Sequence, residues 1–294
     1  MIPIDVWNIA TFDDALVLVL REHGDLVRDY LTTSRRQWIE RELSDHTQPH
    51  AINRYGSDYI GFIEAVGRAM ESRTIRAWHY CRMTDDEVAA LRRTGITLST
   101  IETLRARLDA QVRVGALSAV KAEGLFSASP FHSDQHGARA GKYWMTSHPV
   151  APDDSGVELL VGQWGGEVAY FWLRDQALID RVAALGRGRV VEVAVPIAAT
   201  RPSYSAGEAV VATFARTLGC KPDKKAFDLY TARPLAPGAI LSVHSDGKAD
   251  YLALGFGFPT GYVDTDVGHY DEILAEWTSS ASSDDEVVGR VRSS

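Results

Sequence analysis

The segment Ala77–Glu87, with the sequence AWHYCRMTDDE, decides how this chain is interpreted. It places His79 in a short run of apolar and aromatic residues, which is typical of a β-strand. A helix is predicted to begin directly afterwards, because Thr84 and Glu87 have the spacing of a capping box. Gly95 is the expected end of that helix, since glycine favours the position after a last helical turn. The segment therefore predicts a strand with an internal histidine, followed at once by a capped helix.

Composition narrows the class of protein. The chain has 294 residues, of which 45% are hydrophobic and 24% charged, enough for a large core without disulfides. The formal net charge of −8 argues against a broad nucleic-acid-binding surface. Two cysteines make neither a disulfide framework nor a metal cluster. Without a signal-peptide pattern or an apolar run of about 18 residues, a cytoplasmic protein with no membrane partner is expected.

The patterning divides the chain into three parts. Residues 1–73 are predicted to form an N-terminal helical domain, because Leu16, Leu20 and other apolar residues recur at helical spacing. Residues 74–278 are predicted to form an α+β domain. Residues 279–294 are rich in Ser, Asp and Glu, a composition typical of a disordered tail.

The α+β prediction depends on many strand candidates with helices clustered between them, which favours a mixed or antiparallel sheet. The predicted strands cover residues 75–81, 143–146, 158–161, 168–173, 190–195, 227–231, 240–243 and 251–256. The predicted helices in this part cover residues 85–93, 101–113 (begun by Ser99), 116–125, 176–185 and 207–218.

His79 is the first candidate site residue. Strand alternation places Ile75, Ala77, His79 and Cys81 on one face, so the histidine interrupts an apolar row. A buried imidazole needs a hydrogen-bond partner, and a ligand hydroxyl is one candidate. The alternative is a histidine whose partner lies within the protein core.

A second candidate segment is residues 141–147, GKYWMTS. Here Tyr143 opens an aromatic strand, and Thr146 adds a hydroxyl at its end. This pattern is compatible with an aromatic ligand pocket. It is equally compatible with a core strand packed through its aromatic side chains.

A third segment, residues 162–171, has the sequence GQWGGEVAYF. Glu167 stands among aromatic residues, where a carboxylate is costly unless it has a specific partner, and such groups are enriched at functional sites. The alternative is that Gly165-Gly166 is a hairpin turn and Glu167 a solvated strand residue.

Together, the three segments resemble the histidine–tyrosine–glutamate group of ADP-ribosyltransferases, which includes the diphtheria-toxin-like enzymes and the PARPs. The resemblance covers residues 75–256 and implies a split β-sheet core of ADP-ribosyltransferase type. It also implies NAD as the substrate that donates ADP-ribose to an acceptor, with release of nicotinamide. In that scheme His79 orients the adenosine-side ribose and Tyr143 stacks on nicotinamide. Glu167, or else Glu208, stabilises the oxocarbenium-like transition state.

The resemblance also implies the rest of the NAD-binding set, which is Tyr80, Cys81 and Thr146 beside His79 and Tyr143. Family members often have glycine where this chain has Tyr80, so its side chain is expected to point away from the cofactor while its backbone holds the nicotinamide amide. No metal site is expected. The histidines of the loop that contains residues 127–141, and the nearby His148, match no standard ligand spacing.

The resemblance does not identify the ADP-ribose acceptor, which can be a protein, a nucleic acid or a small molecule. By analogy with the family, the chain is a bacterial toxin or defence factor whose N-terminal helices bind a target or an antitoxin. Two alternatives stand beside this prediction. One is an NAD glycohydrolase, in which water replaces the acceptor, and the other is a non-catalytic binding module that keeps the fold.

Overall fold

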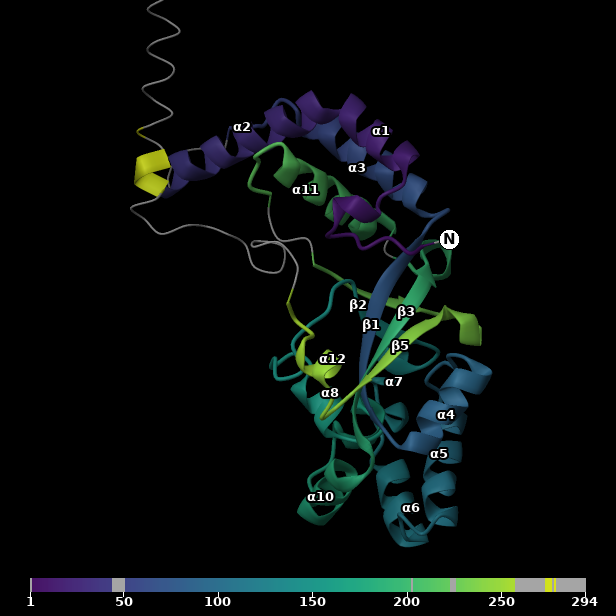
Figure 1. Cartoon of the computed structure of the whole chain (residues 1–294). Coiled ribbons are helices and arrows are strands. Elements are labelled where there is room, and N and C mark those ends of the chain that lie inside the picture. The colour runs from purple at the N-terminus through teal and green to yellow at the C-terminus, as the bar shows by residue number, and fades with distance from the viewer. Residues whose placement is uncertain are drawn as a thin grey trace, which may run out of the picture.

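The centre of the molecule is a five-stranded antiparallel sheet with the strand order β4-β2-β1-β3-β5 (Figure 1). The computed structural model describes residues 2–43, 51–201, 203–222, 226–256, 273–276 and 278. The strands are β1 (Thr74–Met83), β2 (Tyr143–Thr146), β3 (Arg187–Pro196), β4 (Asp228–Thr231) and β5 (Ile240–Ser245). The chain therefore has the predicted mixture of helix and strand, and its sheet is antiparallel.

The longest pairing in this sheet joins β1 to β3. It runs without a break from Thr74 opposite Pro196 to Met83 opposite Arg187. Both strands are rich in β-branched and apolar residues, and the valines of β3 are fully buried. β1 is thereby held at the centre of the sheet, with His79 in its middle.

One group of helices packs at the upper end of the sheet in Figure 1. It consists of α1 (Asp14–Glu22), α2 (Gly24–Leu43), α3 (Gly56–Met70) and α11 (Ser203–Thr217). Leu16 and Val66 of these helices belong to the same hydrophobic cluster as Ile75 and Val191 of the sheet. The described residues 2–43 and 51–73 are thus largely helical, and they share their core with the sheet.

A second group of helices lies at the opposite end of the sheet (Figure 1). It consists of α4 (Asp85–Thr94), α5 (Ile101–Arg113), α6 (Ala119–Ser127) and α10 (Gln176–Ala184). These helices have a separate hydrophobic cluster that includes Leu104, Leu108, Trp164 and Val182. The space between this group and the sheet is where the candidate site lies.

The predicted strand around His79 and the capped helix that follows it are confirmed. Thr84 caps α4, with its side-chain oxygen 3.3 Å from the Glu87 nitrogen, and Glu87 Oε2 accepts from the Thr84 nitrogen at 2.8 Å. Gly95 follows the last turn with a φ of 84°. The cap of α5 differs from the prediction: Thr100 makes it with Thr103, one residue after Ser99, whose backbone is bridged to Lys142.

Three predicted strands are wrong. Residues 158–161 belong to the helix α8 (Glu158–Gly162), residues 168–170 to α9 (Glu167–Tyr170), and residues 251–252 to α12 (Ala249–Leu252). Short apolar runs do not distinguish a strand from a buried helical turn by periodicity. Here the short helices that contain Val161 and Tyr251 pack against one face of the sheet.

Two helices begin at residues other than those predicted. α6 begins three residues later than predicted because Ser118 caps it, and α11 begins at Ser203 rather than at residue 207. The other short elements are α7 (His136–Arg139) and the 3-10 turns Ile9–Thr11, Pro130–His132, Ile197–Ala199 and Pro237–Ala239. No helix in the described segments has the length and apolarity to cross a bilayer. The predicted tail, residues 279–294, lies outside the described residues.

The contact between α3 and α11 gives a test of the upper core. A Cβ at Gly207 would lie 2.7 Å from the Gly67 nitrogen and 2.9 Å from the Ile63 oxygen, both of them backbone atoms that have no room to move aside. Gly207→Ala is therefore expected to lower the free energy of unfolding by about 1–3 kcal/mol, measured by urea denaturation.

The matched control is Gly61→Ala on α3, where a Cβ meets nothing within 4 Å. Because alanine is the better helix former, that variant should gain up to about 1 kcal/mol. Equal stability of the two variants would contradict the close packing of α3 and α11.

Candidate functional site

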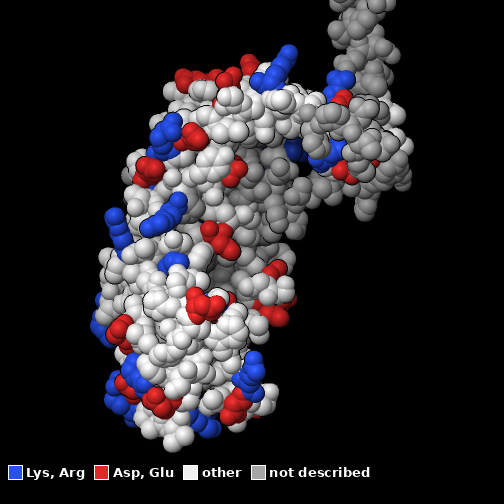
Figure 2. Space-filling view, turned by 180° about the vertical axis from the view of Figure 1, so that it is seen from behind, with Lys and Arg blue, Asp and Glu red and all other residues white. Residues whose placement is uncertain are grey.

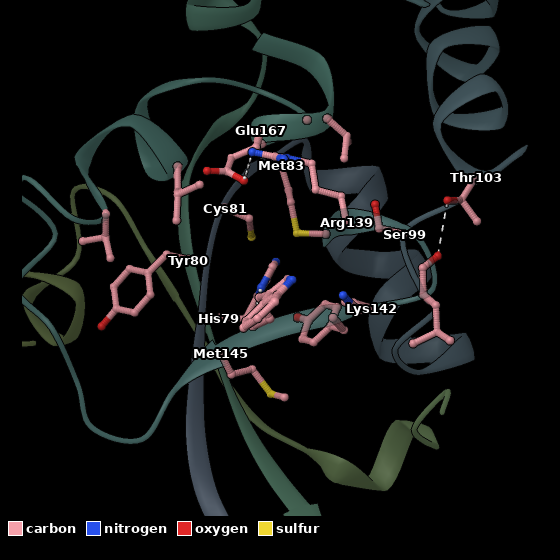
Figure 3. A pocket seen from close by; sticks show the side chains of 18 of the residues that line it. His79, Tyr80, Cys81, Met83, Ser99, Thr103, Arg139, Lys142, Met145 and Glu167 are labelled. Atoms are coloured by element: carbon pink, nitrogen blue, oxygen red, sulfur yellow. Dashed lines mark hydrogen bonds and ion pairs between the residues drawn. The ribbon is translucent and has the colours of Figure 1, made fainter. Parts of the chain in front are cut away.

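A cavity of about 570 Å³ lies between the sheet and the second group of helices. His79 and Cys81 of β1, Tyr143 of β2, and Glu167 of α9 all contribute to its wall. Figure 3 shows His79 and Cys81 on one side, with Arg139 and Glu167 above them. Cavities of this size hold small-molecule ligands. The structure thus brings together His79, Tyr143 and Glu167, which come from three separate segments of the chain.

His79 is held as a neutral imidazole with one nitrogen free. Its Nδ1 lies 2.7 Å from the Trp144 carbonyl oxygen, and because a carbonyl only accepts, Nδ1 carries the hydrogen. Burial lowers the pKa of His79 to about 4, and the nearby positive charge of Arg107 adds to that lowering. Nε2 is therefore a hydrogen-bond acceptor at neutral pH, suited to a hydroxyl group of a ligand.

Tyr143 packs directly on this imidazole. The ring centroids of His79 and Tyr143 are 4.0 Å apart, with 30° between the ring planes. This spacing leaves no room for a third ring between them, so a ligand ring must contact the outside of the pair. The Tyr143 hydroxyl is buried and has no hydrogen-bond partner among the described residues. It is an unused donor next to the cavity, and burial raises its pKa well above the ordinary value.

Glu167 is not the strand residue that one interpretation of the sequence assumed. Gly165 and Gly166 adopt φ angles of 88° and 65°, which glycine tolerates, and Glu167 then begins α9. Its Oε2 lies 2.9 Å from Arg139 Nη2, with the Glu167 side chain 42% exposed and that of Arg139 10% exposed. The carboxylate therefore has both a cationic partner and access to water.

Glu208, the second-choice acid, is not brought to the cavity. The chain turns after β3 and begins α11 already at Ser203, so Glu208 lies in the upper group of helices. Its charge acts on Tyr204 there, and it does not line the cavity that contains His79. Glu208 is therefore removed as a candidate. The physical reason is that α11 packs against α3 instead of returning along the sheet.

The three other predicted NAD-binding residues line the cavity in different ways. Tyr80 turns its phenol to the opposite face of the sheet, where it donates to the Val150 carbonyl at 2.8 Å, and Figure 3 shows its ring pointing away from His79. Burial raises the pKa of the Cys81 thiol to about 12, so it is protonated and unreactive. Thr146 uses its hydroxyl hydrogen within the protein, on the His148 carbonyl at 2.7 Å.

Asp228 is a cavity residue that the sequence analysis missed. It opens β4 directly opposite Thr146 in the register, and desolvation by the surrounding chain raises its pKa. In the described part of the chain it has no salt-bridge partner. The available signal was an acid at the start of the predicted strand 227–231. Only the antiparallel pairing of β4 with β2 shows that this acid lies opposite Thr146, at the other end of β2 from Tyr143.

The three cations of the lining, Arg107, Arg139 and Lys142, were missed as well. Arg107 comes from α5, and Lys142 directly precedes β2. Lys142 Nζ donates to the Gly137 carbonyl at 2.7 Å and lies 4.9 Å from the centroid of the Tyr230 ring. The cavity therefore combines aromatic rings, acids and cations.

Comparison with known proteins finds no match to this chain among family models, curated proteins or solved structures. Function is therefore inferred from the geometry of the cavity.

The raised pKa of Asp228 predicts a pH-dependent stability. A carboxyl whose folded pKa lies above its ordinary value of 3.8 stabilises the fold only while it is protonated, and its ionisation at higher pH costs stability. Asp228 is exposed at the start of β4, and solvent screening weakens this effect. Asp228→Asn should therefore raise the melting temperature only slightly at pH 7, and the gain should vanish as the pH approaches 4. Thermal unfolding of both proteins across that range measures it.

The exposed acid Asp153 provides the control. Asp153→Asn should leave the melting temperature within about one degree at either pH, because exposed surface substitutions change stability little. A loss of stability in Asp228→Asn at pH 7 would show that Asp228 is held ionised by a partner.

Proposed function

We propose that the cavity binds NAD and that the protein transfers ADP-ribose to an acceptor, with release of nicotinamide. The observation that carries this proposal is the convergence of His79, Tyr143 and two carboxylates, Glu167 and Asp228, on one cavity. The finer fold class belongs to the same proposal, with the antiparallel sheet corresponding to the split sheet of ADP-ribosyltransferases.

The neutral imidazole and the aromatic stack suit two parts of NAD, which are the adenosine-side ribose and the nicotinamide ring. His79 Nε2 accepts a hydrogen bond from a ribose hydroxyl, because Nδ1–H is already committed to Trp144. The outer face of the His79–Tyr143 pair offers a surface for the nicotinamide ring. The resemblance assigns the nicotinamide amide to the backbone of Tyr80, whose side chain occupies the other face of the sheet.

The reaction itself needs negative charge near the ribose. When the bond between C1′ and the nicotinamide nitrogen breaks, nicotinamide leaves with the electron pair and positive charge develops on the sugar. A nucleophile of the acceptor then attacks C1′ and gives up its proton. A carboxylate beside C1′ stabilises this transition state more strongly than the ground state.

Glu167 and Asp228 are the two candidates for that carboxylate. Glu167 is half-exposed and its charge is largely balanced by Arg139 at 2.9 Å. Asp228 has no such counter-charge in the described segments, so its full charge acts on the ligand once it is ionised. Glu167 remains the first choice from sequence, and Asp228 is the competitor that the cavity adds.

One observation favours NAD hydrolysis as a second candidate. The Glu167 side chain is 42% exposed, so water reaches the carboxylate that would stabilise the cation. In the absence of an acceptor, that water is the available nucleophile.

The acceptor and cellular role are part of the proposal. On the face shown in Figure 2, basic and acidic side chains are mixed and form no continuous basic stripe, which favours a protein or small-molecule acceptor over nucleic acid. We place the protein in the cytoplasm as a toxin or defence factor, with α1, α2 and α3 contributing the surface for a target or antitoxin.

Loss of either ring tests the proposed pocket. His79→Ala removes the hydroxyl acceptor and Tyr143→Ala removes the stacking surface, so each should weaken NAD binding at least about tenfold while circular dichroism shows the fold retained. Isothermal calorimetry measures the affinity. Trp172→Ala is the control, since Trp172 is 45% exposed and outside the cavity lining. Unchanged NAD affinity in both site variants would overturn the assignment.

Radiolabelled NAD identifies the acid and the reaction. Glu167→Gln or Asp228→Asn, whichever removes the charge that stabilises the transition state, should slow nicotinamide release about 10²- to 10³-fold with NAD affinity preserved. Label on an acceptor indicates transfer, whereas free ADP-ribose indicates hydrolysis. Wild-type protein that binds NAD but releases no nicotinamide with any acceptor would indicate a binding module.

A further inference from the structure

Arg107 lines the cavity, but the proposed reaction assigns it no role. It lies on α5 and forms part of the wall that faces the sheet. Its Nε donates to Glu87 Oε1 at 2.7 Å, and its guanidinium lies 4.8 Å from the centroid of the Trp164 ring. One edge of the guanidinium is thus fixed by α4, and one face is covered by an aromatic ring.

The groups that hold Arg107 are themselves fixed. Glu87 Oε2 accepts from the Trp164 Nε1 at 2.8 Å and from the Thr84 nitrogen at 2.8 Å. Trp164 is fully buried. Burial by itself would raise the pKa of Glu87, but Arg107 and these hydrogen bonds outweigh it and the pKa is lowered. Glu87 is therefore an ionised, well-ordered anchor for Arg107.

The other edge of the guanidinium is unused. Neither terminal nitrogen of Arg107 makes a hydrogen bond to any described residue, although the side chain is only 31% exposed. A planar fork of donors matches two oxygens of a phosphate. Because the side chain is already ordered, binding such an anion costs little further conformational entropy.

The other two cations of the lining are more committed. Arg139 is paired with Glu167, and its Nη1 donates to Gln135 at 3.0 Å. Lys142 donates to two backbone carbonyls, of Gly137 and Ala138. The Nε of Arg139 is buried without a partner, but only one of its donor edges is open in this way. Arg107 differs from both cations, because neither of its two terminal nitrogens has a hydrogen-bond partner among the described residues.

We propose that Arg107, positioned by Glu87 and Trp164, binds a phosphate of the ligand, so that the cavity selects a nucleotide diphosphate over its phosphate-free nucleoside. This inference rests on the proposed function for the identity of the nucleotide. Aromatic rings and an imidazole acceptor bind the nucleoside portion, and the guanidinium binds the anionic portion. Two walls of one cavity thus bind different parts of the ligand. The wall formed by β1 and β2 binds the nucleoside through its ring pair, and the wall formed by α5 binds the phosphate through Arg107.

Calorimetry with two ligands tests this division. For Arg107→Lys, NAD is expected to bind about 10- to 100-fold more weakly, because a charge-assisted fork is lost, whereas nicotinamide riboside should bind within about twofold of the wild type. The double variant Glu87→Gln/Arg107→Gln removes both charges, leaves no buried carboxylate unpaired, and should show the same pattern. Arg105→Gln is the control on the same helix, since Arg105 pairs with Glu123 at the surface.

The outcomes separate this inference from the proposed function. NAD affinity that is unchanged in both Arg107 variants, or an equal loss for NAD and the riboside, overturns the role of Arg107 and leaves the NAD site standing. If the wild type binds inorganic diphosphate but not NAD, and Arg107→Lys loses that binding, the anion site stands and the proposed function fails. A wild type that binds neither ligand overturns both.

Discussion

The carboxylate of Glu87 links the elements around the cavity. It completes the cap of α4, accepts the indole hydrogen of Trp164 and holds Arg107 of α5. Each contact alone is an ordinary hydrogen bond, but together they satisfy a buried charge that would otherwise be costly. Because β1 ends directly before Thr84, the same carboxylate also fixes where the central strand stops. The cavity wall and the sheet are therefore joined through one residue.

Burial sets the chemical state of the groups around this cavity. It keeps His79 neutral with a pKa of about 4 and Cys81 protonated with a pKa of about 12, which leaves an acceptor and excludes a nucleophilic thiolate. On the other face of the sheet a buried acid has a different role. Glu192 lies 3.1 Å from His244 Nε2 and also pairs with Arg76, so its charge is balanced by neighbours. The candidate carboxylates of the cavity differ from Glu192 in exposure, because the Glu167 side chain is 42% exposed and Asp228 is exposed at the start of β4.

Local sequence patterns predicted the secondary structure correctly where a strand pattern or a helix cap was clear. The strand around His79, the capping box at Thr84 and the strand Tyr143–Thr146 lie where their residues predict. Prediction failed for residues 158–161 and 168–173, whose apolar runs are short enough to suit either state. In those places packing against the sheet and the φ angles of Gly165 and Gly166 selected helical turns. The candidate acid at Glu167 consequently stands at a helix start, beside Arg139 rather than in an apolar strand.

The sequence by itself determined the mixture of helix and strand, the central β1–α4 unit and the candidate pair His79 and Tyr143, because caps, β-branched runs and turn residues act over a few neighbours. Only the tertiary structure decided which distant groups share the cavity. The antiparallel register brings Asp228 opposite Thr146, and the packing of α11 on α3 takes Glu208 away from it. These placements depend on pairing between segments far apart in the chain, which no local pattern encodes. The position of Arg107 also depends on the tertiary structure, because its guanidinium is held only where α4, α5 and Trp164 pack together.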